Sequence, residues 1–248
     1  MHRTLEVPLD SLDAALLAAP VADRLELCDD LSSEGWTPPM SLIRAVRESI
    51  DTSRTEIVSM IRPRSASNSA ALDVAAFTTT PRILTDCLHE IEASAKAGAH
   101  SVAIGLLTPD GHVDVEACGR MAALGRECGM VIAFLRTFDL LVDRQRGMDD
   151  LTSLGMRRVV TAGVPGWDAS VRTLAERLQV LSTDTRHAAA AAARLGGTPV
   201  EVVPGGGVRA SNAAEFLTVS PHLHASCRRD GAISTAELSA LRGVLDGG

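Results

Sequence analysis

The chain has 248 residues, of which 46% are hydrophobic and 22% are charged, so it can bury a sizeable core and general disorder is disfavoured. Aromatic residues make up only 2% and tyrosine is absent, which leaves Ala, Val, Leu and Ile to build that core. The formal net charge of −7 argues against nucleic-acid or anionic-membrane partners, because such partners attract basic surfaces.

The cysteines and the amino terminus indicate a cellular location. The five cysteines are odd in number and contain no Cys-x-x-Cys pair, which is typical of reduced, cytoplasmic proteins. Leu5 to Val7 follow the start without the apolar segment of a signal peptide, and no later run approaches ~18 apolar residues. We therefore expect a soluble cytoplasmic protein with no membrane partner.

Strand patterns alternate with helical patterns along the first half of the chain. In order, the sequence predicts a strand at 5–7, a helix capped by Asp10-Ser11, a strand at 24–28, a helix through Leu42 and Ile50, a strand at 56–64, a long loop at 65–80, a helix from Pro81 to Gly98, and a strand at 101–107.

The second half continues the alternation. It predicts a helix at 114–128, a strand at 130–138, a helix ending at Gly155, a strand at 158–161, a helix at 168–181, an alanine-rich helix at 187–194, a strand at 199–203, a short helix near Asn212, a strand at 222–227, and a last helix at 236–245. Such units repeating at about thirty residues indicate an α/β protein, a single-domain (β/α)8 TIM barrel over residues 1–248. A doubly wound open sheet is the alternative.

Polar residues end several of the apolar strands. Pro63 stops the third strand between Arg62 and Arg64, because proline lacks a backbone donor and restricts its predecessor. In a barrel these ends converge on one mouth, where the sequence places Glu6, Glu26, Cys28, Arg62, Arg64, Arg136, Asp139, Thr161, Gly205 to Gly207 and His224.

The arginines and glycines of this set suit an anionic ligand. Arg62 and Arg136 could hold a carboxylate or phosphate in forked geometry, with Arg64 and Glu6 as further substrate-binding candidates. Alternatively, the arginines only neutralise nearby carboxylates. Gly205, Gly206 and Gly207 formally fit a dinucleotide signature, but their late position instead favours an anion held by backbone N–H groups, or simply a tight turn.

The remaining polar residues suggest proton transfer or metal binding. Glu26 or Asp139 could act as general base and His224 as acid or proton shuttle, unless the histidine is structural. Cys28, His224 and Cys227 are the candidate metal ligands, since thiolate and imidazole suit copper or zinc, and copper is the possible cofactor. The alternative is that both cysteines are buried packing residues.

Several ordered segments give the chain a family resemblance. They are Leu5-Glu6-Val7, Ala22-Asp23-Arg24-Leu25-Glu26-Leu27-Cys28, Gly35-Trp36-Thr37-Pro38, Ile61-Arg62-Pro63-Arg64, Arg136-Thr137-Phe138-Asp139, Gly205-Gly206-Gly207-Val208 and His224-Ala225-Ser226. Through them the sequence resembles the CutC-type copper homeostasis proteins. The resemblance implies a cytoplasmic (β/α)8 barrel, often a homo-oligomer, with a role in copper handling and no established reaction.

The chain departs from this family pattern at a few positions. Pro8 stands where the family carries cysteine, Leu135 where it carries histidine, and His222 where it carries glutamate. Ser65 and Ala66 replace the glycines after Arg-Pro-Arg. Three functions stay open: a Cu(I)-binding protein, an enzyme acting on a small anionic or phosphorylated metabolite, and a non-catalytic metabolite-binding barrel.

Overall fold

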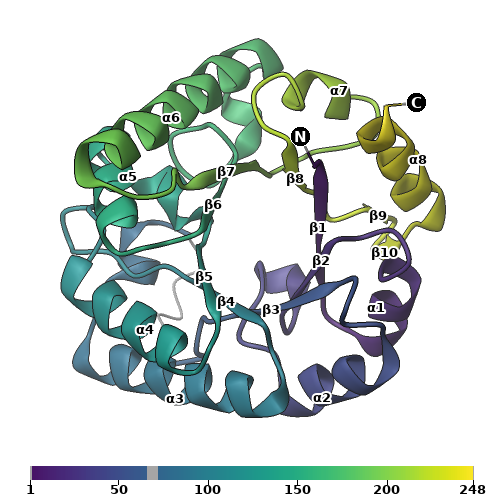
Figure 1. The fold of residues 1–248 in the computed structure, drawn as a ribbon, viewed down its shortest axis with the longest axis horizontal. Helices are drawn as coiled ribbons and strands as arrows, with labels where there is room; N and C mark the ends of the chain where they lie inside the picture. Colours follow the sequence, from purple (N-terminus) through teal and green to yellow (C-terminus); the bar gives the residue numbers. More distant parts are fainter. Residues whose placement is uncertain (1, 66–71, 248) are drawn as a thin grey trace.

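The predicted strands pair as parallel neighbours around one ring in the computed structural model, which describes residues 2–65 and 72–247 (Figure 1). The eight-stranded sheet has the order β7-β6-β5-β4-β3-β2-β1-β8. Its strands are β1 (Thr4–Leu9), β2 (Arg24–Leu27), β3 (Glu56–Met60), β4 (Ser101–Ile104), β5 (Val131–Phe134), β6 (Arg158–Thr161), β7 (Glu201–Pro204) and β8 (His222–His224). β7 and β8 lie side by side and complete the ring, which confirms the (β/α)8 barrel and excludes the open sheet.

Helices surround the ring on its outer side (Figure 1). They are α1 (Leu12–Ala18), α2 (Met40–Ser49), α3 (Pro81–Ala97), α4 (Val115–Glu127), α5 (Arg144–Ser153), α6 (Leu174–Leu195), α7 (Ala213–Phe216) and α8 (Thr235–Asp246). Side chains that precede the helices supply the caps: Ser11, Thr80, Asp114 and Thr173 each accept a bond from a first-turn N–H. Local sequence therefore sets where most helices begin.

Alternation along the strands divides the core into two clusters. Leu5, Val7 and Leu9 of β1 belong to the large cluster that the strands form with the surrounding helices. A smaller cluster without helix residues fills part of the barrel interior and consists of Cys28, Val58, Met60, Ala103, Ala133 and Leu135. Charged side chains of β1, β2, β6 and β8 also point into the barrel, because they alternate with the apolar side chains that face the helices. The interior is therefore apolar on one side and ionic on the other.

Four strands end earlier than the sequence predicts. β3 stops at Met60, β4 at Ile104, β5 at Phe134 and β8 at His224, several residues before the predicted ends. After β5 the chain turns into a 3₁₀ helix, η3 (Arg136–Leu140), and after β8 Cys227 takes a left-handed φ of 51°. The apolar runs continue past the strands because these turns are also buried, so hydrophobicity alone does not mark the ends.

Other connections also differ from the prediction. The helix predicted at 168–181 begins only at Leu174, after a short 3₁₀ helix, η4 (Ala169–Val171). It continues without a break through the helix predicted at 187–194, so the two predictions correspond to the single helix α6. A small hairpin, β9 (Arg228–Arg229) with β10 (Ala232–Ile233), follows β8 and was not predicted. The predicted long loop contains a 3₁₀ helix, η2 (Val74–Phe77), and its residues 66–71, including Ala66, lie outside the described residues.

Within residues 2–65 and 72–247, no helix combines the length and the apolar character needed to cross a lipid bilayer.

Candidate active site at the barrel mouth

A cavity of about 390 Å³ opens at the carboxyl ends of the strands. Its lining comes from nearly every part of the ring and consists of Pro8, Glu26, Leu31, Glu34, Met60, Phe77, Leu135, Arg136, Val160, Trp167, Gly206, Gly207, His224, Ser226 and Arg228. Of the residues that the sequence proposes for catalysis or binding, the structure brings Glu26, His224, Arg136, Gly206 and Gly207 together here. The mouth is therefore a mixed site with acidic, basic and apolar walls.

His224 is held between two glutamates of the barrel interior. Its Nδ1 lies 2.9 Å from Oε1 of Glu6, and its Nε2 lies 3.9 Å from Oε2 of Glu26. The parallel register sets Glu6 directly beside His224, while Arg24 on β2 contacts the other oxygen of Glu6 at 2.7 Å. Glu6 thus orients the imidazole from below, and Glu26 approaches it from the cavity.

The same contacts shift the proton affinities of all three groups. Burial raises the pKa of Glu26 to about 7, and the charge of Glu6 adds to that effect against the opposing charge of His224. Burial alone would lower the pKa of His224, but its hydrogen bond to Glu6 and the charges of Glu26 and Glu6 raise it. For Glu6, Arg24 and His224 outweigh burial and hold the pKa far below its usual range.

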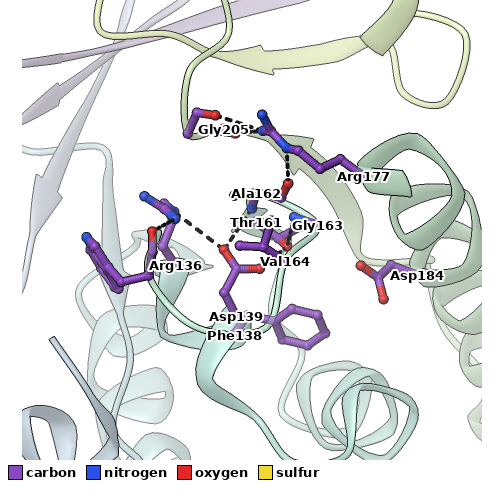
Figure 2. Close-up of polar contacts among 12 residues, drawn as sticks. Arg136, Phe138, Asp139, Thr161, Ala162, Gly163, Val164, Arg177, Asp184 and Gly205 are labelled. Atoms are coloured by element: carbon purple, nitrogen blue, oxygen red, sulfur yellow. Dashed lines mark hydrogen bonds and ion pairs between the residues drawn. The ribbon is translucent and has the colours of Figure 1, made fainter. Parts of the chain in front are cut away.

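Asp139, the other predicted general base, is enclosed by donors and does not line the cavity. Its carboxylate accepts from Thr161 Oγ1 at 2.5 Å, the Ala162 N–H at 2.8 Å and Arg136 Nε at 3.4 Å (Figure 2). It also accepts from Arg144 Nη1 at 3.1 Å. Arg144 continues this network to Asp184 of α6, at 2.6 Å. With both oxygens occupied, Asp139 fixes η3 and the end of β6 in place.

Arg136 reaches the cavity from the start of η3. Its guanidinium lies 4.7 Å from the ring centre of Trp167 and donates to the Trp167 carbonyl at 2.8 Å. Trp167 in turn stacks on Phe77, with ring centres 5.7 Å apart. Arg136 therefore joins the charged wall of the cavity to an aromatic wall.

Arg62 and Arg64 lie apart from Arg136. Arg62 is 4% exposed, stacks over Trp36 at 4.1 Å and Phe77 at 5.1 Å, and donates to the carbonyls of Ser33 and Gly35. Arg64 is largely exposed and pairs with Asp29 at 2.5 Å. Neither side chain is part of the cavity lining, so Arg62 does not join Arg136 there as the sequence suggests.

The glycine segment after β7 forms a turn against the neighbouring strands. Gly206 and Gly207 adopt φ values of 66° and 84°, which glycine tolerates far better than other residues. A Cβ on Gly206 would lie 2.8 Å from the Ala162 Cβ. Gly205 abuts His224, since its own Cβ would lie 3.5 Å from Cδ2 of that ring. Glycine is required here both by conformation and by close packing.

The three predicted metal ligands do not meet. Cys28 packs in the interior cluster and donates to the Leu9 carbonyl at 3.4 Å, whereas Cys227 belongs to the outer cluster and donates to the Ala225 carbonyl at 3.4 Å. Burial raises the pKa of both thiols, that of Cys227 to about 12. Across the described ranges, no group of three His, Cys, Asp or Glu side chains is placed to hold a metal ion.

Several residues of the site carry no clear signal in the sequence. Trp167 and Ser226 line the cavity from loops and Phe77 lines it from η2. A tryptophan in a loop of this aromatic-poor chain is the one feature that could have marked Trp167. Arg177 sits within a helical pattern, yet it bonds the backbone of two mouth loops (Figure 2). Pro8 and Leu135 also line the cavity. Two of the positions that depart from the family pattern are therefore part of the site.

Comparisons with known proteins agree with this architecture. The CutC family model matches residues 3–228. A CutC family protein of Histophilus somni (strain 2336) is 32% identical over 227 residues, 90% of this chain and 82% of that protein. The human copper homeostasis protein cutC homolog is 31% identical over 245 residues, 97% of this chain and 80% of that protein.

A solved structure gives the same result for the fold. The crystal structure of CutC from Streptococcus agalactiae superposes with a TM-score of 0.75 at 21% identity, covering 90% of this chain and 98% of that one. The family match extends over nearly the whole barrel, including Glu6, Glu26 and His224. This chain belongs to the CutC family.

Proposed function

We propose that the barrel mouth binds a small anionic metabolite and exchanges a proton with it through Glu26 and His224. The observation that carries this proposal is that both groups line one cavity, with Nε2 of His224 and Oε2 of Glu26 only 3.9 Å apart. Glu6 occupies Nδ1 of the imidazole, which leaves Nε2 for the ligand. A carboxylate that orients a histidine in this way is a common arrangement for acid–base catalysis.

The proton affinities suit this role. The raised pKa of His224 favours its imidazolium form, which suits the role of general acid. Glu26, with a pKa of about 7, can hold or release a proton under the same conditions and is the matching base. Arg136 and the imidazolium supply positive charge to the same cavity, which favours an anionic ligand.

Thermal-shift screening of phosphorylated and carboxylated metabolites, followed by NMR detection of solvent deuterium in the ligands that bind, tests the proposal. We expect Glu26→Gln and His224→Gln to abolish deuterium incorporation. Glu34→Gln serves as the matched control, because Glu34 lines the same cavity without contacting His224 in the described residues. Deuterium incorporation that persists in both variants contradicts the assignment. Ligands that bind the wild-type protein but take up no deuterium favour the non-catalytic barrel.

Copper binding is the second candidate, supported by the family and by one local feature. Met60 and Cys28, which both carry sulfur, pack against the same glycine, Gly35. A Cβ placed on Gly35 would lie 2.8 Å from the Met60 Sδ and 3.3 Å from the Cys28 Cβ. Sulfur ligands suit Cu(I). Burial raises the pKa of Cys28, so the metal would have to displace a thiol proton.

Titration with Cu(I) against a competing chelator tests this candidate. We expect Cys28→Ser to weaken binding more than His224→Ala, because the thiolate is the softer ligand. Unchanged affinity in both variants contradicts copper binding at the mouth.

The five free cysteines also support the expected location in the reducing cytoplasm.

A further inference from the structure

A buried arginine shapes the glycine turn behind the cavity. Arg177 projects from α6 and is 7% exposed. Its Nε donates to the Ala162 carbonyl, and its Nη2 donates to the carbonyls of Gly205 and Gly206, all at 2.7 Å (Figure 2). One guanidinium thus ties the end of β6 to the turn after β7.

These bonds fix the direction of two amide groups. All peptide bonds in the described residues are trans, and in a trans peptide the N–H points opposite to the preceding carbonyl. Because the carbonyls of Gly205 and Gly206 point to Arg177, the N–H groups of Gly206 and Gly207 point away from it. Both glycines line the cavity, and neither N–H has an acceptor among the described residues.

The charge of Arg177 is not paired with a carboxylate. Its hydrogen bonds go to carbonyl oxygens, and no carboxylate of the described ranges lies within ion-pair distance of it. Burial and then the charge of Arg136 lower the pKa of Arg177, and the more distant charge of Asp139 offsets them only in part. A buried cation without a paired carboxylate is costly, and an anion on the other face of the turn would reduce that cost.

Further donors surround the same position. Ser226 lines the cavity from the segment that follows β8, and its Oγ accepts from Arg209 at 3.2 Å, which leaves its hydroxyl proton free to point into the cavity. A Cβ on Gly206 would lie 3.4 Å from Cζ of Arg136. Two amides, a hydroxyl and the guanidinium of Arg136 offer more donors than the two oxygens of a carboxylate can accept.

We propose that the Gly206–Gly207 turn and Ser226 bind the phosphoryl group of a phosphate monoester, and that Arg177 positions the turn for it. The inference rests on the proposed function and names its substrate class. Loops after the seventh and eighth strands are frequent phosphate sites in barrels of this type. With its phosphoryl group there, beside His224, the rest of the ligand extends towards Glu26 and the Phe77–Trp167 wall.

Calorimetric titration of the full-length protein with inorganic phosphate and with acetate, at pH 7 in chloride buffer, tests the inference. We expect phosphate to bind at least about tenfold more tightly than acetate, since charge-assisted bonds to several oxygens add up. Arg177→Lys should weaken phosphate binding by about tenfold or more, because a lysine cannot hold three carbonyls in one fork. Ser226→Ala should weaken it by about threefold to tenfold.

Arg186→Lys is the matched control, since Arg186 lies exposed on the same helix, and we expect its affinity for phosphate to be unchanged. If Arg177→Lys fails to fold, Ser226→Ala still decides. Phosphate binding that is unchanged in the variants, or no tighter than acetate binding, overturns the inference. Binding of carboxylated ligands without phosphate preference overturns the phosphoryl site but leaves the proposed function standing. Binding of neither anion contradicts both.

Discussion

Two buried carboxylates near the barrel mouth, Asp139 and Glu26, differ in how their oxygens are occupied. Asp139 receives bonds from two arginines, a hydroxyl and a backbone amide. Glu26 receives no hydrogen bond from the described residues, and its one ion-pair contact there is His224 at 3.9 Å. The comparison shows that burial of a carboxylate does not by itself indicate chemistry. An enclosed carboxylate such as Asp139 stabilises the surrounding backbone, whereas one that is open to a cavity can exchange protons.

The largest expected effect on stability comes from removing the charge of Asp139. Asp139→Asn leaves the guanidinium groups of Arg136 and Arg144 without their shared carboxylate, and we expect a loss of about 3–5 kcal/mol in the free energy of unfolding. Urea denaturation at pH 7 measures it. Asp13→Asn, an exposed change of the same kind on α1, should cost less than about 1 kcal/mol. Equal effects of the two substitutions would contradict a structural role for Asp139.

Glu26→Gln should change the free energy of unfolding in the opposite direction and stabilise the protein. Burial raises the pKa of Glu26 from 4.5 to about 7, so the folded state favours the protonated side chain. The corresponding stability is present below the unfolded pKa and is lost as the pH rises through about 7. A glutamine, neutral throughout, should therefore make the protein more stable at pH 8 by on the order of 3 kcal/mol, with little change at pH 5.

Urea denaturation of wild type and Glu26→Gln at the two pH values checks this sign. A variant that is less stable than wild type at pH 8 would show that Glu26 is an enclosed structural carboxylate like Asp139.

The two arginines of the Arg-Pro-Arg segment extend the comparison to cations. Arg62→Lys loses the stacking on Trp36 and Phe77 and two carbonyl bonds, and we expect destabilisation by about 1–3 kcal/mol. Arg64→Lys changes only an exposed pair with Asp29 and should cost less than about 1 kcal/mol. Thermal unfolding of both variants measures the difference. Similar melting temperatures would count against the buried role of Arg62.

The smallest effect concerns two histidines of one strand. Glu6 and Glu26 raise the pKa of His224 against the effect of burial, whereas burial lowers the pKa of His222 in spite of Glu201. NMR titration of the imidazole signals should therefore place the two midpoints on opposite sides of the usual histidine value of about 6.5. Coincident titration would show that the glutamates do not control His224.

The elements of the barrel could be predicted from the sequence more fully than their ends. The number, order and type of the main strands follow from short apolar runs that alternate with helical patterns, as in Leu5 to Leu9 and Ile57 to Met60. The ends of β5 and β8 were missed because the following turns are also buried. The hairpin after β8 turns at Asp230 and Gly231, both with positive φ, and the hydrophobic pattern used to find strands does not register such a turn.

The site was predicted in part. Glu26, Arg136, His224 and the glycines follow strands, and the barrel brings every strand end to one mouth. Proximity to a strand end could not separate Arg136, which reaches the cavity, from Arg62, which turns to Trp36 and Phe77. The direction of a side chain after a strand depends on local turns and neighbours, and these are set only when the chain is folded.

The sequence by itself determined the (β/α)8 architecture and the CutC family, because periodicity and ordered motifs are properties of the chain as written. Only the tertiary structure decided that Asp139 is enclosed while Glu26 is open, that Cys28 and Cys227 lie in separate clusters, and that Arg177 turns two glycine amides towards the cavity. Hydrogen bonding and burial join residues far apart in the chain, and these contacts give each charged group its role.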